Sequence, residues 1–219
     1  MHKRTILSIL SLLALASLIL SACVAPSAPS QAGGAATESS AEASAADKTL
    51  RVNVGAYPDM MDPQKSSFVV EIAHLKLLYQ GLTDLDDKLE TVPGAAEAWQ
   101  YNDDATQLAF TLREGLLYSD GSVLNAARFA YSLMRNIDPM TAGEYASITD
   151  EISGAPEWRG CGEDTAKCDE AKAAVAESIK ASHADGADCT GYDDAACNML
   201  TLTFSKPAPY FHTVASLWV

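Results

Sequence analysis

Cysteine is the residue type in this sequence whose chemistry depends most clearly on spacing. Four cysteines fall in the last third of the chain, as two pairs: Cys161 and Cys168, then Cys189 and Cys197. In an exported protein an even number of cysteines indicates disulfides, and four allow three connectivities that spacing does not separate. A zinc site is the alternative, but both pairs are spaced more widely than the roughly two to four intervening residues usual for zinc ligands. We therefore expect two disulfides and no metal.

The fifth cysteine, Cys23, follows a segment that is typical of export. Residues 2–4 are basic, and residues 6–20 form an apolar run that is short for a membrane span, as in a secretory signal peptide. The sequence Leu20-Ser21-Ala22-Cys23 resembles the lipobox, where a bacterial signal peptidase cuts before a lipid-modified cysteine. We expect residues 1–22 to be a lipoprotein signal peptide and Cys23 to be the lipidated N-terminus. An ordinary signal peptide with a chance cysteine is the alternative.

The segment after Cys23 is almost entirely Ala, Ser, Pro, Gly and Glu up to about residue 47. It shows no hydrophobic periodicity, so we expect residues 23–48 to be a lipidated, disordered tether between the membrane and a folded domain.

Other groups that could catalyse a reaction are scattered. Four histidines and several adjacent acidic pairs are present, but none forms a metalloprotease or serine-hydrolase motif such as H-E-x-x-H or G-x-S-x-G. Because no such motif is present, an exported lipoprotein enzyme is only the second hypothesis, behind a binding protein. A structural surface protein would predict internal repeats, which the sequence lacks.

The composition narrows the class of partner. The chain has 219 residues, 48% of them hydrophobic, which is enough for a packed core. Its formal net charge of −14 would repel a phosphate backbone, so we expect no nucleic-acid partner.

Alternating apolar residues predict three strands, over residues 49–55, 107–113 and 200–204. Clusters of Asp, Gly and Ser predict tight turns at residues 86–88 and 119–121. These strands and turns indicate a mixed α/β domain.

Helical spacing of apolar residues predicts three helices. The first covers about residues 69–80 and is expected to end at Gly81 in the left-handed conformation. The second covers about 125–137 and is capped by its first residue, and the third covers about 169–183. Residues 93–99 are expected to be a turn that leads into a short helix.

Six ordered motifs resemble extracellular solute-binding protein family 5, the oligopeptide- and dipeptide-binding receptors of bacterial ABC importers. The motifs are Met61-Asp62-Pro63-Gln64-Lys65, Leu78-Tyr79-Gln80-Gly81-Leu82, Val92-Pro93-Gly94-Ala95-Ala96-Glu97-Ala98-Trp99, Phe110-Thr111-Leu112-Arg113-Glu114-Gly115 with Tyr118-Ser119-Asp120-Gly121, Phe129-Ala130-Tyr131-Ser132 to Asp138-Pro139, and Lys206-Pro207-Ala208-Pro209-Tyr210-Phe211.

This resemblance implies an α/β fold with mixed α+β lobes, of the periplasmic-binding-protein-like class II, in which two lobes close around a ligand. Members of the family are much longer than this chain. We therefore expect an N-terminal fragment with an incomplete fold that lacks the second major lobe. Residues 49–219 would hold the start of lobe I and a smaller inserted domain, with a cysteine-rich insertion at about residues 153–198.

The function implied by the resemblance is capture without chemistry. Such a protein is a cofactor-free monomer, held outside the cytoplasmic membrane by its lipid, in the periplasm or at the cell surface, that delivers peptides to the ABC permease. The ligand-proximal parts of the family match Ser66, Ser67, Phe68, Val69 and Tyr131, although the apolar members of this set could equally belong to the core. Receptors of the same fold bind nickel complexes, haem or oligosaccharides, so a non-peptide ligand is an alternative.

One departure from the family pattern concerns charge. The family usually begins a helix with Thr-Ala-x-Asp after the Asp-Gly turn, whereas this chain has Asn125-Ala126-Ala127-Arg128. A basic residue therefore replaces an acidic one in the first turn of the predicted helix.

Overall fold

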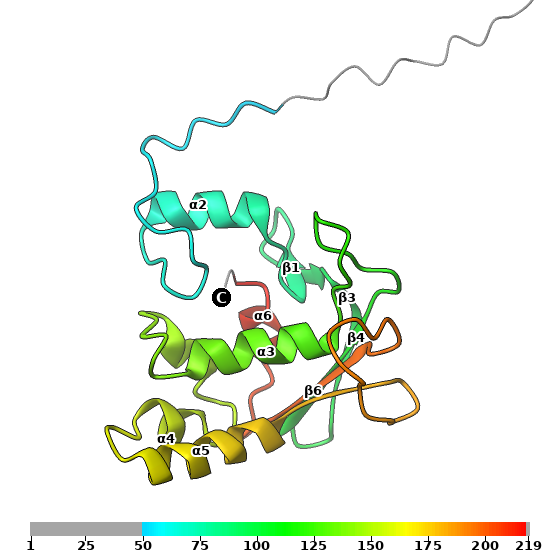
Figure 1. Cartoon of the computed structure of the whole chain (residues 1–219). Coiled ribbons are helices and arrows are strands. Elements are labelled where there is room, and N and C mark those ends of the chain that lie inside the picture. Colours follow the sequence, from blue (N-terminus) through cyan, green and yellow to red (C-terminus); the bar gives the residue numbers. More distant parts are fainter. Residues whose placement is uncertain (1–49, 218–219) are drawn as a thin grey trace, which may run out of the picture. The chain divides into compact units, whose positions relative to one another are not determined.

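Two antiparallel sheets, with helices beside them, make up the described part of the chain, residues 50–217, in a computed structural model (Figure 1). The predicted signal peptide, Cys23 and the predicted tether lie outside these residues. The strands are β1 Thr83–Leu85, β2 Thr91–Pro93, β3 Ala96–Tyr101, β4 Gln107–Leu112, β5 Ile179–Ser182 and β6 Met199–Thr203. The helices are α2 Val69–Leu78, α3 Ala126–Ile137, the 3₁₀ helix η1 Ala146–Thr149, α4 Ala155–Arg159, α5 Thr165–Ser178 and α6 Phe211–Val214.

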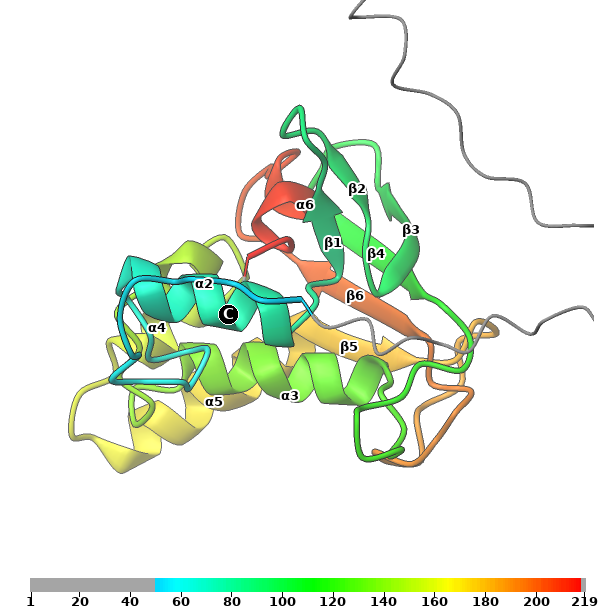
Figure 2. The ribbon, with the colours of Figure 1, turned by 90° about the horizontal axis from the view of Figure 1, so that it is seen from above.

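The larger sheet has the strand order β3-β4-β6-β5, and each neighbouring pair is antiparallel (Figure 2). Its two central strands have the alternating sequences that predicted them. Their register places Leu108 opposite Leu202 and Phe110 opposite Leu200, and all four side chains are fully buried. The predicted strands over residues 107–113 and 200–204 are therefore confirmed.

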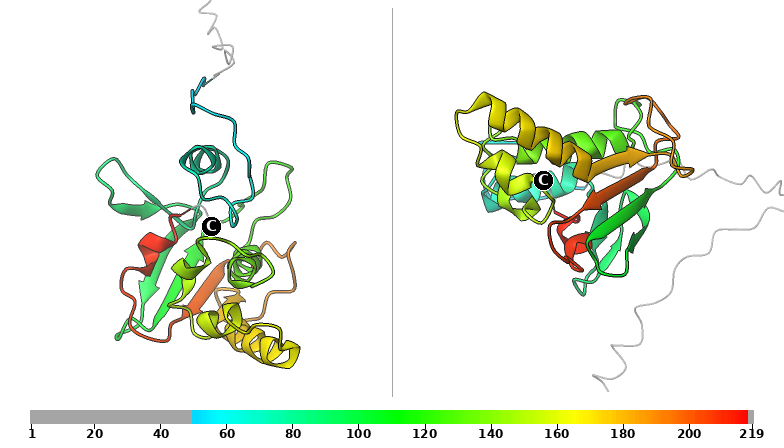
Figure 3. Two further views of the ribbon diagram at one scale, coloured as in Figure 1. Left: turned by 90° about the vertical axis from the view of Figure 1, so that its left-hand side faces the viewer. Right: turned by 90° about the horizontal axis from the view of Figure 1, so that it is seen from below.

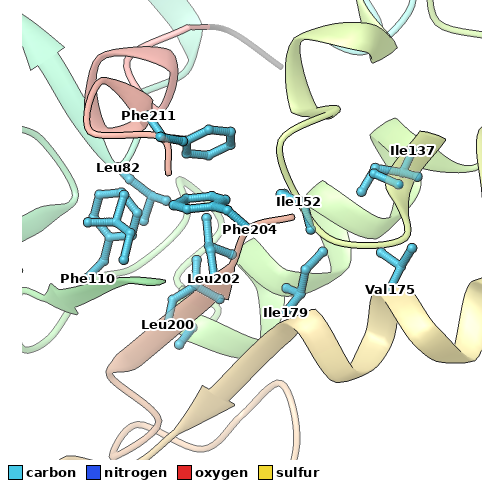
Figure 4. Packing of buried hydrophobic residues seen from close by; sticks show 14 of the residues in the cluster. Leu82, Phe110, Ile137, Ile152, Val175, Ile179, Leu200, Leu202, Phe204 and Phe211 are labelled. Carbon is cyan, nitrogen blue, oxygen red and sulfur yellow. The ribbon is translucent and has the colours of Figure 1, made fainter. Parts of the chain in front are cut away.

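The hydrophobic core lies where this sheet meets the surrounding helices (Figure 4). The rings of Phe204 and Phe211 contact each other at 4.8 Å between centroids and continue the core from β6 to α6. On the other side, Ile152, Val175 and Ile179 are buried between the sheet, α4 and α5. Burying each such side chain stabilises the fold by about 1.5–3 kcal/mol.

The β1–β2 hairpin confirms the turn predicted at residues 86–88. The carboxylate of Asp86 accepts hydrogen bonds from the backbone N–H of Lys88 and of Glu90, at 2.8 and 2.9 Å. At the other predicted turn, Gly121 has a φ of +84°, and its N–H donates to the carbonyl of Tyr118. Both turns form because a short acidic side chain or a glycine satisfies local backbone requirements.

The cysteines pair locally, as Cys161–Cys168 and Cys189–Cys197. The structure thus selects one of the three connectivities. Among residues 50–217, no group of three or more His, Cys, Asp or Glu side chains is placed to hold a metal ion.

The loop closed by the second disulfide is joined to the start of α3 through Asn125. The Asn125 side-chain oxygen accepts the N–H of Arg128, which caps the helix as predicted. Its amide group donates to the carbonyls of Gly191 and Asp194, both at 3.0 Å. Within the loop, the backbone N–H of Thr190 and the imidazole of His183 hold the pKa of Asp194 well below its usual range. The loop is therefore rigidly tied to the helix N-terminus.

Of two predicted helical segments, one is wrong and the other is confirmed with different bounds, and in both cases strand pairing overrides local helical propensity at some of the residues. Residues 93–99 do not form a turn and a short helix; most of them belong to β3, where Trp99 pairs opposite Phe110. The helix predicted over 169–183 begins earlier, because Asp164 caps α5, and ends at Ser178. The residues that follow form β5, the edge strand next to β6.

Two further expectations near the start of the described chain are also wrong. Residues 50–55 form no strand, and Leu50 and Val52 are exposed. An alternating pattern indicates that one face of a segment is apolar, but it does not supply a partner strand. A strand needs a neighbouring strand for its backbone hydrogen bonds, and no described strand pairs with this segment. Gly81 is not left-handed; it is needed because a Cβ there would lie 2.6 Å from the carbonyl oxygen of Ala215.

Within residues 50–217, none of the helices combines the length and apolar character needed to cross a membrane.

We expect Asn125→Ala to lower the free energy of unfolding by about 2–3 kcal/mol, because the change removes a helix cap and leaves two carbonyls without their donor. The matched control is Asp164→Ala, which removes only an exposed cap of α5 and should cost about 1 kcal/mol. Urea denaturation followed by circular dichroism measures both values. Equal losses in the two variants would show that the bonds to the disulfide loop contribute nothing.

Candidate ligand-binding surface

The segment before α2, which contains Asp62 and Gln64, is fixed to α3 by a bidentate ion pair. The Arg135 guanidinium donates to both carboxylate oxygens of Asp62, at 2.8 and 2.5 Å, and also to the side-chain oxygen of Gln64. The Gln64 amide in turn donates to the backbone carbonyl of Ser132, at 2.8 Å. The hydrogen bond from Arg135 lowers the pKa of Asp62 from its ordinary value of 3.8. These contacts hold the segment against one face of α3.

The next residues form a tight, internally bonded start to α2. The Ser66 hydroxyl is buried and lies within hydrogen-bonding distance of the carbonyls of Met60 and Asp62, at 3.0 and 2.8 Å. The buried carboxylate of Glu71 accepts the backbone N–H groups of Met60, Ser67 and Phe68. Glu71 thereby satisfies N–H groups that a helix start leaves without partners. Of the predicted site residues, Ser66 therefore faces inward and serves the loop itself.

Ser67 is half-buried, whereas the other three predicted residues are exposed. Phe68 is 67% exposed and Val69 is 82% exposed, at the first turn of α2. Tyr131 on α3 is 56% exposed. None of these three side chains belongs to the core of the described chain, which leaves them available for a ligand or for another polypeptide segment.

Tyr131 belongs to an aromatic cluster that forms around an arginine. The guanidinium carbon of Arg128 lies 5.3 Å from the ring centre of Tyr118 and 5.1 Å from that of Tyr192. The Tyr192 ring also meets Tyr131 edge-on, at 6.1 Å. A cation between two aromatic faces is stabilised by the quadrupole of each ring. The basic residue that departs from the family pattern is thus the centre of this cluster.

Sequence reasoning did not single out Tyr118 and Tyr192 as site residues. Tyr118 precedes the Asp120-Gly121 turn and Tyr192 lies inside the Cys189–Cys197 loop, far from Arg128 along the chain. These two tyrosines come together with Arg128 because the Cys189–Cys197 loop is hydrogen-bonded to the start of α3. No local sequence pattern indicates this contact.

A cavity of about 340 Å³ lies next to the cluster. The helices α2 and α3 lie apart from each other in Figure 1 and are seen nearly end-on in the left view of Figure 3, and residues of both contribute to the cavity walls (Figures 1–3). Tyr79 comes from the end of α2, and Arg128, Phe129 and Leu133 come from α3. Further parts of the walls come from residues 80–82, from the segment 116–124, from Leu202 of β6 and from the α6 region.

Comparison with known proteins identifies the family of the chain. Residues 90–218 match the family described as "Bacterial extracellular solute-binding proteins, family 5 Middle". The chain belongs to this solute-binding family. The resemblance seen in the six motifs is therefore confirmed.

Relatives of the solute-binding family include the periplasmic oligopeptide-binding protein OppA of Escherichia coli, which is 33% identical over 168 residues. That match covers 75% of this chain and 26% of the relative. The periplasmic murein peptide-binding protein MppA of the same bacterium is 37% identical over 89 residues, which is 41% of this chain and 16% of MppA.

Solved structures of the family confirm the fold. Haemophilus influenzae OppA in complex with the peptide RPPGFSPFR has a TM-score of 0.59 and 26% identity, over 75% of this chain and 28% of that structure. The Escherichia coli murein tripeptide binding protein MppA gives a TM-score of 0.57 and 26% identity, over 74% of this chain and 28% of that structure. The chain has a periplasmic-binding-protein-like fold and spans about a quarter of the length of these relatives, which corresponds to part of a lobe.

We expect Asp62→Asn to destabilise the chain by about 1 kcal/mol at neutral pH, because the variant loses a charge-assisted pair with Arg135. Since the folded state lowers the pKa of Asp62, this contribution is complete above the ordinary value of 3.8 and is lost as the pH falls through the lowered pKa. The difference between wild type and variant should therefore shrink towards pH 3.

A double-mutant cycle with Arg135→Gln isolates the coupling between the two side chains. The measurement is urea denaturation at pH 7 and at pH 3. A coupling energy that is the same at both values would contradict the proposed contribution of the pair.

Proposed function

We propose that this chain is part of the substrate-binding component of an ABC importer that captures peptides outside the cytoplasmic membrane and delivers them to the permease. The observation that carries the proposal is membership of the family 5 solute-binding proteins, several of whose relatives are named as oligopeptide-binding proteins. The exposed side chains of Phe68, Val69 and Tyr131, together with the half-buried Ser67, supply the ligand-facing surface. Ser66 is buried and stabilises the loop that carries this surface, through hydrogen bonding to the carbonyls of Met60 and Asp62.

The geometry of this surface suits a peptide. Phe68 and Val69 project from the start of α2, whose backbone is held by Glu71, and Tyr131 projects from the helix that anchors the same segment through Arg135. Exposed apolar and aromatic groups on a rigid base contribute contact area while losing little conformational entropy on binding. A peptide held there would make main-chain hydrogen bonds and place its side chains in hydrated pockets, which gives affinity without sequence selectivity.

The enzyme hypothesis finds no support in the groups that come closest to a catalytic arrangement. His183 and the hydroxyl of Thr190 both donate to the same carboxylate, that of Asp194, at 2.8 and 3.0 Å. In a catalytic triad the histidine lies between the hydroxyl and the carboxylate, so that it can take the proton of the nucleophile. Here the carboxylate occupies the central position and fixes the disulfide loop. We therefore propose binding without chemistry.

Peptides are the ligand class that the relatives favour, although the family is broader. Other matching proteins are named as glutathione-binding and as a probable deoxycholate-binding protein. Glutathione is itself a tripeptide, so peptide recognition accounts for more of the matching names than a nickel complex, haem or an oligosaccharide does.

The proposal also covers the export of the protein and its attachment to the membrane. Residues 1–22 direct export, Cys23 carries the lipid that anchors the chain to the membrane, and residues 23–48 form the tether. Residues 49–219 then supply the start of lobe I and the smaller inserted domain, with the cysteine-rich insertion at about 153–198. In this proposal the receptor acts as a monomer beside its permease.

The test of peptide capture compares two proteins. One is the chain of 219 residues, and the other is the longest polypeptide that its gene encodes. Isothermal titration with a mixture of tri- to pentapeptides should give a micromolar dissociation constant for a polypeptide that contains both lobes, and none for the chain alone, because closure of two lobes encloses the ligand. A two-lobed product that retains no peptide would contradict the proposal.

Within that two-lobed protein, Tyr131→Ala should weaken peptide binding about 10-fold, because an exposed aromatic contact is a frequent hot spot. The matched control is Leu89→Ala, a large exposed apolar side chain at the tip of the β1–β2 hairpin, which should leave the affinity unchanged. An equal loss of peptide affinity in both variants would show that Tyr131 does not contact the ligand.

Lipid attachment is tested separately, by expressing the chain in bacteria that are fed labelled palmitate. We expect the wild type to incorporate label and to sediment with membranes. The Cys23→Ser variant should incorporate none and should appear in the soluble fraction. Label that persists in the variant would contradict the assignment of Cys23.

A further inference from the structure

The ring of Tyr192 lies next to the proposed ligand-facing surface. It meets the ring of Tyr131 edge-on, with 6.1 Å between the ring centres and 75° between the ring planes. Tyr131 is 56% exposed and Tyr192 is 47% exposed, so about half of each side chain is open to a ligand. Tyr192 is not among the residues that the family resemblance places near the ligand. The two rings therefore form an exposed aromatic pair that extends this surface.

The helix α3 positions both members of the pair. Tyr131 lies three residues after Arg128, on the same face of the helix. Arg128 in turn holds the loop that carries Tyr192. Its Nε donates to the carbonyl of Tyr192 at 3.4 Å, its guanidinium carbon lies 5.1 Å from the centre of the Tyr192 ring, and it forms an ion pair with Asp193. The contacts of Arg128 thus keep the Tyr192 ring beside Tyr131.

The loop around Tyr192 is closed on both sides. The Cys189–Cys197 disulfide joins its ends, with 5.2 Å between the Cα atoms. The amide group of Asn125 donates to the carbonyl of Gly191, immediately before Tyr192, and to that of Asp194, two residues after it. An aromatic ring on such a constrained loop loses little conformational entropy when a ligand binds.

The chemistry of the pair favours a neutral aromatic ligand group. Aromatic rings attract one another in edge-to-face and offset arrangements, and each ring of the pair still has open surface for such a contact. A cationic side chain is a poorer partner, because the Tyr192 ring already lies against the guanidinium of Arg128 and a second cation on that ring would be repelled by the first.

We propose that Tyr192 is a specificity-determining residue of the peptide site and that, together with Tyr131, it receives an aromatic side chain of the bound peptide. The Cys189–Cys197 disulfide holds Tyr192 in the position that this contact requires. The inference rests on the proposed peptide function and adds to it a preference at one position of the ligand. The rest of the peptide is held without sequence selectivity.

The experiment is isothermal titration of the two-lobed protein with trialanine peptides in which phenylalanine, leucine or lysine replaces each alanine in turn. At one position we expect the phenylalanine peptide to bind about 2- to 10-fold more tightly than the leucine peptide, as one aromatic pair implies. Tyr192→Ala should remove this preference and still bind the leucine peptide, whereas Tyr192→Phe should keep the preference. The matched control is Tyr210→Ala, which removes a ring that is 49% exposed and whose hydroxyl donates to Glu151; it should also keep the preference.

The two disulfides provide a second matched comparison. They close loops of similar length, with sequence separations of 7 and 8 residues, but only the Cys189–Cys197 loop carries Tyr192. Replacing Cys189 and Cys197 together by alanine should therefore lower the preference for phenylalanine. Replacing Cys161 and Cys168 together by alanine should leave it unchanged. Circular dichroism melting of each variant shows that the protein is folded during the titration.

Three results would overturn the inference. The first is equal affinity for the phenylalanine and leucine peptides at every position in the wild type. The second is a preference for phenylalanine that survives in a folded Tyr192→Ala variant. The third is tightest binding of a lysine peptide, which would show that the pair receives a cation. A two-lobed protein that binds none of these peptides would contradict the proposed function itself, whereas peptide binding without a preference that depends on Tyr192 would contradict this inference alone.

Discussion

The antiparallel pairing of β4 with β6 is the interaction on which the rest of this structure depends. It joins residues that are about ninety positions apart and buries Leu108 and Phe110 against Leu200 and Leu202. The edge strands β3 and β5 each hydrogen-bond to one of these two strands, and α3 packs beside β5 and β6. Because the pair is non-local, the chain must close a long loop before the core can form. The cysteine-rich segment lies inside that loop, and each of its disulfides joins cysteines close in sequence.

The helix α3 connects this core to the surfaces that could bind a ligand. One part of it anchors the segment before α2 through Arg135, while Tyr131 and Arg128 on the preceding turns face the aromatic cluster. The N-terminus of α3 is in turn tied to the Cys189–Cys197 loop by Asn125. A single helix therefore helps to set the relative positions of the proposed ligand-facing residues, of the cavity and of the disulfide loop. Such a support is what a binding protein requires, because affinity depends on groups that are already in place.

The basic side chain of Arg128, in the first turn of α3, is balanced by contacts with the Cys189–Cys197 loop. A basic side chain in the first turn of a helix is unfavourable, because the helix dipole places positive charge there. The disulfide loop offsets this cost with the carbonyl and ring face of Tyr192 and the carboxylate of Asp193, and Tyr118, from the turn before α3, adds a second ring face. Arg128 and the Cys189–Cys197 loop thus meet at one place in the structure.

The sequence by itself determined those features in which short-range pattern and burial agree. The alternation in β4 and β6, the cap of α3 at Asn125, the hairpin turn at Asp86 and the six family motifs all express local chemistry, and the structure or the comparisons confirm each one. Only the tertiary structure decided the pairing of the cysteines, the strand at Ala96–Tyr101 and the exposure of Phe68 and Tyr131. Those features depend on which distant residues come to lie beside them. A sequence pattern shows that a residue can be buried or paired, whereas the neighbour that buries or pairs it is supplied by the fold.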